Sequence, residues 1–338
     1  MHMLSTMLPN SIRLTLFSTC LLTVWACEPE SLEPNGNAEI PDTPAPQDFP
    51  SLVEGTLSYQ NRMREYALYI PDSYDGTQAY PLVVFLHGGS GNKTSAQNFT
   101  RFNEVAEAND FLMLYPQGGW EAQPGSFVWA DGRGLPPDQL GINDVGFVNQ
   151  LVTTLKGEYS VVEERVYLCG FSNGSFLSQR IAFEGNEQFA AIGIIGGTMA
   201  EALFNTRTQE RAVPMLYMLG TTDPLVPYDG GIVEGSNTDP IVGIDSALTY
   251  WVRRNECQTQ LAEVRLPNPS TTDNSSVSVI EYTDCSCNNS QVKFYKITGG
   301  GHTWPGVPIP NQTLGAVNLD MQASEEIWEF FKNIERCD

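Results

Sequence analysis

The chain alternates short apolar runs with longer segments in which apolar residues recur every three or four positions. The short runs predict buried strands and the periodic segments predict helices. Strands are expected at residues 64–70, 82–86, 111–115, 166–169, 189–195, 213–219, 261–266, 277–282 and 292–297. Helices are expected at 96–109, 144–158, 173–183, 244–255 and 322–334, the second capped by Asp144. This alternation favours the α/β class, a mostly parallel central sheet with helices on both faces.

The first 27 residues differ in composition from the rest. They contain no acidic residue and one Lys or Arg, Arg13, followed by a thirteen-residue apolar run that ends before Cys27. This run is shorter than the roughly 20 residues of a membrane-spanning helix, so it predicts a secretory signal peptide. Val24–Cys27 resembles a bacterial lipobox, which predicts lipidation of Cys27 and a lipid anchor to the membrane; cleavage near Ala26 is the alternative. Both interpretations place the mature protein outside the cytoplasm, secreted or anchored in the bacterial cell envelope.

Residues 28–50 are rich in Pro, Glu, Asp and Asn and show no apolar periodicity. Such a segment buries too little apolar surface to offset the entropy of ordering it, which predicts a disordered acidic tether. Residues 51–338 carry the whole strand and helix pattern, so we expect a single catalytic domain there.

Composition and charge narrow the function classes. Hydrophobic residues make up 41% of the 338 residues, enough for a large core, and the formal net charge is −22. Nucleic acid is a poor partner because binding phosphates requires a basic face, and anionic membrane surfaces would be repelled. The acidity fits an enzyme that acts on uncharged material.

A Gly-x-Ser-x-Gly sequence, Gly170–Gly174, lies between a predicted strand and a predicted helix. In that context Ser172 is expected on a tight turn that exposes its hydroxyl as a nucleophile. The backbone N–H of Asn173, at the start of the helix, would face the developing negative charge. A chance pentapeptide is the alternative, and its place between strand and helix favours the catalytic interpretation.

The chain has three histidines, and they limit the choice of a catalytic base. His2 belongs to the signal peptide. His87 lies in Leu86-His-Gly-Gly-Ser90, after a buried strand, where backbone N–H groups of Gly88, Gly89 and Ser90 could form an oxyanion hole. His302 follows the last strand on a glycine-rich loop and is the candidate base; the alternative is a solvated loop histidine.

The acid that orients the base should follow a strand between the serine and the histidine. The apolar run Met215–Leu219 is followed by Gly220-Thr-Thr-Asp223, which places Asp223 at the end of a predicted strand. Asp223 is therefore the preferred acid. Asp229 lies further into the loop and Asp245 looks like a helix start. These three roles predict attack on an ester carbonyl through an acyl-enzyme, with no metal and no organic cofactor.

Cysteine usage indicates an oxidising compartment. Cys169 lies within an apolar strand and is expected as a buried thiol. Two disulfides could form among the other four cysteines, Cys257, Cys285, Cys287 and Cys337. A zinc site is the alternative, and it is disfavoured because no histidine accompanies these thiols. A bridge between Cys285 and Cys287 would be strained. This favours pairing Cys257 with one of them and Cys337 with the other. A Cys257–Cys285 disulfide would stabilise the folded state by about 3–4 kcal/mol, because it restricts the unfolded chain.

Four segments together resemble the polyhydroxybutyrate depolymerase-like esterases, α/β-hydrolases close to the feruloyl and acetylxylan esterases. The likeness runs from about Tyr66 to the C-terminal helix. It implies the α/β-hydrolase fold, with Ser172 as nucleophile, Asp223 as acid and His302 as base, and a disulfide between Cys257 and Cys285. The segments are Leu86–Ser90, Gly170–Gly174, Gly220–Gly230 and Gly300–Gly306.

The resemblance also suggests that Trp304 lines the substrate cleft, although packing of the loop around His302 is equally compatible with its position. Trp129 and Trp120 are further candidates for the cleft wall. Gly220-Thr221 stands where relatives commonly have His-Gly, which changes no member of the triad.

The expected function is a secreted serine carboxylic ester hydrolase. A serine peptidase on the same fold is an alternative, and a lipoprotein that only binds polymer or glycan is another. The expected partner is an ester substrate, either a polyester fragment or an esterified plant polysaccharide. The pattern does not rank these esters, because an apolar pocket discriminates one methylene by only about 1–3 kcal/mol.

Overall fold

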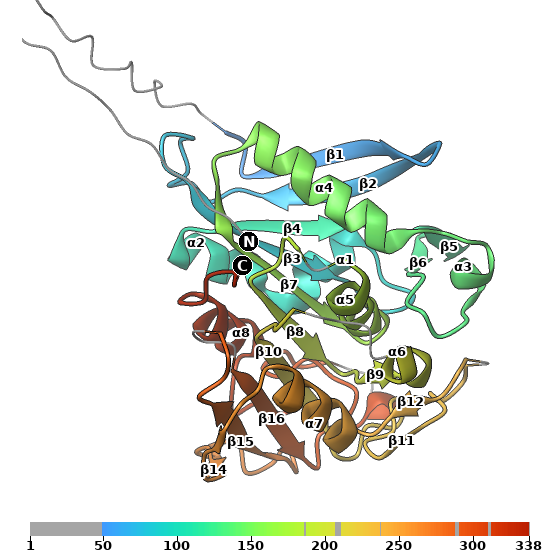
Figure 1. Ribbon diagram of the computed structural model, residues 1–338, viewed down its shortest axis with the longest axis vertical. Helices are drawn as coiled ribbons and strands as arrows, with labels where there is room; N and C mark the ends of the chain where they lie inside the picture. Colours follow the sequence, from blue (N-terminus) through green and yellow to red (C-terminus); the bar gives the residue numbers. More distant parts are fainter. Residues whose placement is uncertain are drawn as a thin grey trace, which may run out of the picture. The chain divides into compact units, whose positions relative to one another are not determined.

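A computed structural model describes residues 49–185, 187–206, 211–236, 238–287, 291–309 and 312–337. Within these residues one large sheet forms the centre of the fold (Figure 1). Its strands lie in the order β1 (Leu52–Tyr59), β2 (Arg62–Tyr69), β4 (Leu112–Pro116), β3 (Tyr80–Leu86), β7 (Val161–Phe171), β8 (Ala191–Ile195), β10 (Met215–Gly220), β16 (Val292–Thr298), β15 (Ser276–Thr283) and β13 (Thr259–Gln260), and β14 (Val264–Arg265) pairs with β15.

The middle of this sheet is parallel and its two edges are antiparallel. The strands from β4 to β16 in the spatial order all pair in parallel, whereas β1, β2, β15, β13 and β14 pair antiparallel. Central parallel strands are covered on both faces, which explains why β3 and β8 are apolar along almost their whole length. The predicted α/β class with a mostly parallel central sheet is confirmed.

Alternate residues of each central strand enter two separate cores. Leu82 and Val84 of β3 face one core, while Val83 and Phe85 face the other. This follows from the two-residue period of a strand. Eight α-helices are described: α1 (Lys93–Thr100), α2 (Phe102–Asn109), α3 (Pro136–Gln139), α4 (Asp144–Glu158), α5 (Asn173–Glu184), α6 (Glu201–Thr206), α7 (Ile244–Arg254) and α8 (Ala323–Phe331).

The helices divide between the two cores. Apolar residues of α4, α5 and α7 pack into the first core, and these helices cross in front of the strands in Figure 1. Apolar residues of α1, α2 and α8 pack into the second. Short elements complete the described fold: β5 (Trp120–Gln123), β6 (Ser126–Val128), β9 (Met199–Ala200), β11 (Gly230–Gly231), β12 (Ile241–Val242) and the 3₁₀ turn η1 (Gln312–Leu314).

Several element boundaries differ from the sequence prediction. Strand β1 was not expected; its side chains alternate between exposed and half-buried, which is a weak pattern for an edge strand. The helix expected at 96–109 is two helices, because Arg101 adopts a left-handed conformation with φ 58° and ends α1. The Gly/Pro-rich stretch 117–141 contains β5, β6 and α3.

The expected capping role of Asp144 is wrong by one residue. Asn143 is the cap of α4, and its side chain accepts a hydrogen bond from the N–H of Gly146 at 2.8 Å. Asp144 is instead fully buried. Its carboxylate accepts one hydrogen bond of 2.6 Å from Nη2 of Arg64 and another of 2.8 Å from the N–H of Ala130. The carboxylate therefore joins three distant segments: β2, the loop before α3, and α4.

The cysteines form the two disulfides allowed by the sequence. Cys257 bonds to Cys285 and Cys287 bonds to Cys337, while Cys169 is a free, fully buried thiol. Burial raises the pKa of the Cys169 thiol well above its usual range, so the group stays protonated and packs as a small apolar side chain. The second bridge ties the C-terminal residues to the loop after β15.

The signal peptide, Cys27 and nearly all of the 28–50 tether lie outside the described residues, so these and the domain boundary at residue 51 stay predictions. Over the ranges that the structure describes, every helix is too short or too polar to cross a membrane.

Breaking the buried Arg64–Asp144 pair should destabilise the protein strongly. We expect Arg64→Ala to lower the free energy of unfolding by about 3–5 kcal/mol, because Asp144 would remain charged and buried without its partner. Arg101→Ala is the matched control, because it also removes an arginine from an ion pair, here the exposed pair with Glu104. It should lower the free energy of unfolding by less than about 1 kcal/mol. Urea unfolding of both variants measures the difference, and equal losses would contradict the argument.

Candidate active site

Ser172 lies at a sharp turn between the end of β7 and the start of α5. Its φ of 53° and ψ of −118° are unusual for a residue with a side chain, and they mark local backbone strain. The backbone N–H of Ser172 donates to the carbonyl of Ile195 on β8 at 2.9 Å. The turn is therefore held against the neighbouring strand, as expected for a serine exposed above a sheet.

The flanking glycines allow the close approach that this turn requires. A Cβ on Gly170 would lie 2.3 Å from the carbonyl oxygen of Gly174, and one on Gly174 would lie 2.1 Å from that of Leu86. Real Cβ atoms do not come this close to backbone oxygens, so both positions need glycine for steric reasons. The first turn of α5 consequently packs directly on the end of β3.

His302 and Asp223 form a buried pair. Nδ1 of His302 lies 2.7 Å from Oδ2 of Asp223, and 4% of the histidine side chain and none of the carboxylate is exposed. The other oxygen, Oδ1, accepts hydrogen bonds of 2.8 Å from the N–H groups of Leu225 and Val226. These two bonds fix the carboxylate so that Oδ2 faces the imidazole, which in turn directs Nε2 away from Asp223.

Asp229 and Asp245, the two rival acids, are both exposed. Asp223 follows β10, and His302 follows β16, the strand that pairs with β10 in parallel. Because neighbouring parallel strands end at the same edge of a sheet, the two side chains meet although 79 residues separate them in sequence.

His302 and Ser172 approach the same point on the end of β8. The imidazole packs on the ring of Phe171, the residue before Ser172, with centroids 4.8 Å apart. Ile195 at the end of β8 binds the N–H of Ser172, and the next residue, Gly196, lies beside the imidazole. A Cβ on Gly196 would be only 3.3 Å from Cε1 of His302. Among the described residues no hydrogen bond joins the hydroxyl of Ser172 to His302, and such catalytic bonds often form only when substrate is bound.

Three backbone N–H groups near Ser172 have no acceptor among the described residues: those of Gly88, Gly89 and Asn173. A Cβ on Gly88 would lie 3.5 Å from Cβ of Ser172, which places the loop beside the serine. Ser90 differs from the expectation, because its N–H donates to the carbonyl of Phe127 at 3.0 Å. The amide of Ser90 is thus engaged and is removed from the candidate oxyanion donors.

His87 holds this loop from inside. Its Nε2 accepts a hydrogen bond of 3.0 Å from the N–H of Gly118, so the proton is on Nδ1, which donates to the carbonyl of Gly88 at 2.8 Å. Burial lowers the pKa of His87 to about 4, partly offset by the bond to Gly88. The ring is therefore neutral at physiological pH and supports the loop.

Two of the three suggested tryptophans, Trp304 and Trp129, do not line a cleft. Trp304 is completely buried and packs on Phe85, Phe102 and Phe171, which supports the alternative that it holds the loop around His302. Trp129 is also completely buried and packs on His87 with centroids 4.7 Å apart. Only Trp120 keeps partial exposure among the three suggested residues. A tryptophan in a glycine-rich loop has the same sequence signature in either role.

The family described as esterase PHB depolymerase matches residues 64–226 of this chain. This range contains the loop of Gly88 and Gly89, the serine turn and the strand that leads to Asp223. The match covers just under half of the chain, and over that range the chain is similar to this esterase family.

Relatives agree with the family. The esterase NocK of Nocardia uniformis subsp. tsuyamanensis is 26% identical over 80% of this chain and 79% of its own length. Feruloyl esterase C of Emericella nidulans is 25% identical over 83% of this chain and 88% of its own length. The acetyl xylan esterase structure from Aspergillus awamori has a TM-score of 0.54 at 16% identity, covers 84% and 99% of the two chains, and is similar in fold. This esterase is therefore a carboxylic ester hydrolase of the α/β-hydrolase fold.

Sequence reasoning missed several polar residues beside the serine of this esterase. Asp131 is completely buried and accepts a hydrogen bond of 2.6 Å from Nδ2 of Asn173. Asp131 lies in the Gly/Pro-rich stretch, where a polar residue usually indicates a solvated loop. The described residues contain no group of three or more His, Cys, Asp or Glu side chains arranged to hold a metal ion.

The neutral, buried state of His87 predicts a specific pH dependence of stability. Its folded pKa lies below the usual unfolded value near 6.5, so its contribution is present above that value and is lost as the pH falls toward 4. Between pH 7 and pH 4.5 this loss amounts to about 2–3 kcal/mol. We expect His87→Gln to lose less stability than the wild type over the same interval, measured by urea unfolding at both pH values. The same loss in both proteins would show that His87 titrates normally.

Proposed function

We propose that this esterase works through a serine nucleophile and an acyl-enzyme, with Ser172, His302 and Asp223 as its catalytic triad. The observation that carries the proposal is the buried His302–Asp223 pair at the sheet edge where the half-buried Ser172 also lies. The order serine, acid, histidine along the chain is the order of α/β-hydrolases.

In this mechanism Oγ of Ser172 attacks the ester carbonyl while Nε2 of His302 takes the hydroxyl proton. The carbonyl π electrons move to oxygen, and the N–H groups of Gly88, Gly89 and Asn173 stabilise that oxyanion. Collapse of the intermediate breaks the bond to the alcohol oxygen, which receives the proton from His302. Water then attacks the acyl-enzyme with His302 again as base, releasing the carboxylic acid and restoring the Ser172 hydroxyl.

The substrate class follows from the relatives. Feruloyl esterase C aligns over most of both chains, whereas the PHB depolymerase family matches an internal range. We therefore rank feruloyl-type esters first, and acetylated xylan and hydroxybutyrate oligomers are the comparison substrates. A purified sample assayed on methyl ferulate, acetylated xylan and a hydroxybutyrate dimer ester orders them by kcat/KM.

We also infer that the protein acts outside the cytoplasm. Two disulfides are formed in the described residues, and such bonds persist in oxidising compartments. Lipidation of Cys27 is part of this proposal. Metabolic labelling with a fatty acid, compared between the wild type and Cys27→Ala, distinguishes an anchored lipoprotein from a free secreted enzyme.

Replacing Ser172 should abolish turnover. We expect Ser172→Ala to lower kcat on 4-nitrophenyl acetate by a factor of about 10⁴ or more, and Asp223→Asn by about 10⁴, because the imidazole then loses its orienting partner. Ser246→Ala, an exposed serine on α7, is the control and should keep the wild-type rate.

Circular dichroism of each variant verifies that it is folded. Undiminished hydrolysis by folded Ser172→Ala would overturn the serine mechanism. Cleavage of peptide substrates in preference to esters would instead favour a peptidase, and a folded wild type without either activity would indicate a binding protein.

A further inference from the structure

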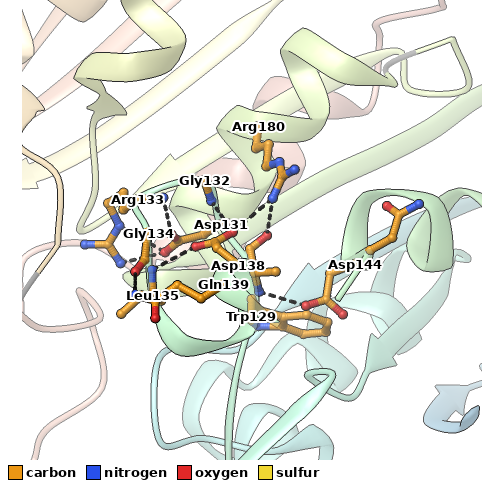
Figure 2. A network of polar contacts seen from close by, with 12 residues as sticks. Trp129, Asp131, Gly132, Arg133, Gly134, Leu135, Asp138, Gln139, Asp144 and Arg180 are labelled. Atoms are coloured by element: carbon orange, nitrogen blue, oxygen red, sulfur yellow. Dashed lines mark hydrogen bonds and ion pairs between the residues drawn. The ribbon is translucent and has the colours of Figure 1, made fainter. Parts of the chain in front are cut away.

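The three residues Trp129–Asp131 contact both halves of the proposed oxyanion hole, so we name them the bridging segment. They follow β6 in the Gly/Pro-rich stretch and run beside the first turns of α5. Figure 2 shows Asp131 in the middle of a polar network that also includes Arg133, Asp138 and Arg180, with Trp129 at its lower edge. Trp129, Ala130 and Asp131 are each completely buried, so this is an internal feature of the fold.

One end of the bridging segment holds the loop that carries Gly88 and Gly89. Nε1 of Trp129 donates to the carbonyl of His87 at 2.9 Å, and the indole packs on the His87 ring. His87 in turn donates to the carbonyl of Gly88. Moving Trp129 would therefore move the His87–Gly88 peptide, whose N–H is one of the two candidate oxyanion donors of this loop.

The other end holds Asn173, the third candidate donor. Oδ1 of Asn173 accepts a hydrogen bond of 2.8 Å from the N–H of Trp129. Nδ2 of Asn173 donates two hydrogen bonds, one of 3.2 Å to the carbonyl of Trp129 and one of 2.6 Å to Oδ2 of Asp131. All the polar atoms of this side chain are thus engaged by the bridging segment. The backbone N–H of Asn173, which belongs to the same residue, remains without an acceptor at the start of α5.

The bridging segment is itself held from several sides. Asp131 binds Nη2 of Arg133 at 2.6 Å and Nε at 3.0 Å, and the Arg133 guanidinium lies 3.8 Å from the centre of the Phe176 ring. The N–H of Ala130 donates to Asp144, and the carbonyl of Ala130 accepts from Arg180. Side chains from α4 and α5, together with Arg133, thus leave these peptides little freedom to shift.

We propose that Trp129 and Asp131 are positioning residues that set the separation between the Gly88–Gly89 donors and the Asn173 donor. This inference rests on the proposed function. Oxyanion donors are effective when they lie about 2.7–3.1 Å from the transition-state oxygen, and they stabilise it best when their positions are fixed in advance. A displacement of about 1 Å can reduce the rate by about 10²-fold while substrate binding is little changed.

The test compares three variants of the full protein. Trp129→Phe removes the hydrogen bond to His87 and retains an aromatic ring. Asp131→Asn removes the charge that binds Asn173 and Arg133 with almost no change in volume. Asp138→Asn is the matched control: it alters a carboxylate of the same network that binds Gly132, Leu135 and Arg180 and touches neither His87 nor Asn173.

We expect Trp129→Phe and Asp131→Asn to lower kcat on 4-nitrophenyl acetate by about 10–100-fold, with KM within about threefold of the wild type. The affinity for phenylboronic acid, which forms a tetrahedral adduct with an active-site serine, should fall by a similar factor. Asp138→Asn should keep kcat within about threefold. A role in folding alone would lower the melting temperature and leave kcat of the folded fraction unchanged.

Asp131→Asn leaves Arg133 buried without its partner and can reduce the yield of folded protein, so Trp129→Phe provides the independent arm. If the wild type is active and folded Trp129→Phe and Asp131→Asn are equally active, the positioning role is overturned and the triad stands. If the wild type itself hydrolyses no ester, the failure lies with the proposed function, and the two failures are therefore distinguishable.

Discussion

The strained turn at Ser172 is the constraint on which the rest of the site depends. A positive φ in a residue with a side chain costs of order 1–3 kcal/mol and persists only where the surroundings leave no alternative. Here the hydrogen bond to Ile195 fixes one side, and the contact of Gly174 with the end of β3 fixes the other. The same geometry places the half-buried Ser172 directly before the first residues of α5, whose N–H groups begin at Asn173.

Much of the fold and the identity of the candidate residues could be predicted because these signals are local. The period of apolar residues distinguishes the buried strands from the helices, and each central strand is short and continuous. The serine motif is informative because it lies between a strand and a helix. With two histidines outside the signal peptide, one of them beside Gly88, His302 was the remaining candidate base, and the structure pairs it with Asp223.

The remainder depends on contacts between residues far apart in the sequence. Arg64 and Asp144 are 80 positions apart, and neither position shows by itself that it is buried. Burial of Trp304 among phenylalanines favours the packing role over the cleft wall, two roles that its sequence position fitted equally. The engagement of the Ser90 amide required the pairing of its loop with β6, which the Gly/Pro-rich sequence does not indicate.

The spatial order of the strands has a consequence for Gly196. The serine comes from β7 and the histidine from β16, and both β8 and β10 lie between them, a span of about 14 Å at the usual spacing of strands. The imidazole must therefore reach across the end of β8 to approach the hydroxyl. Glycine at position 196 leaves room for the ring, because a Cβ there would lie 2.9 Å from Cε2 of Phe171 and 3.3 Å from Cε1 of His302. The strand that contributes no reactive group thus decides whether the imidazole fits beside the serine turn.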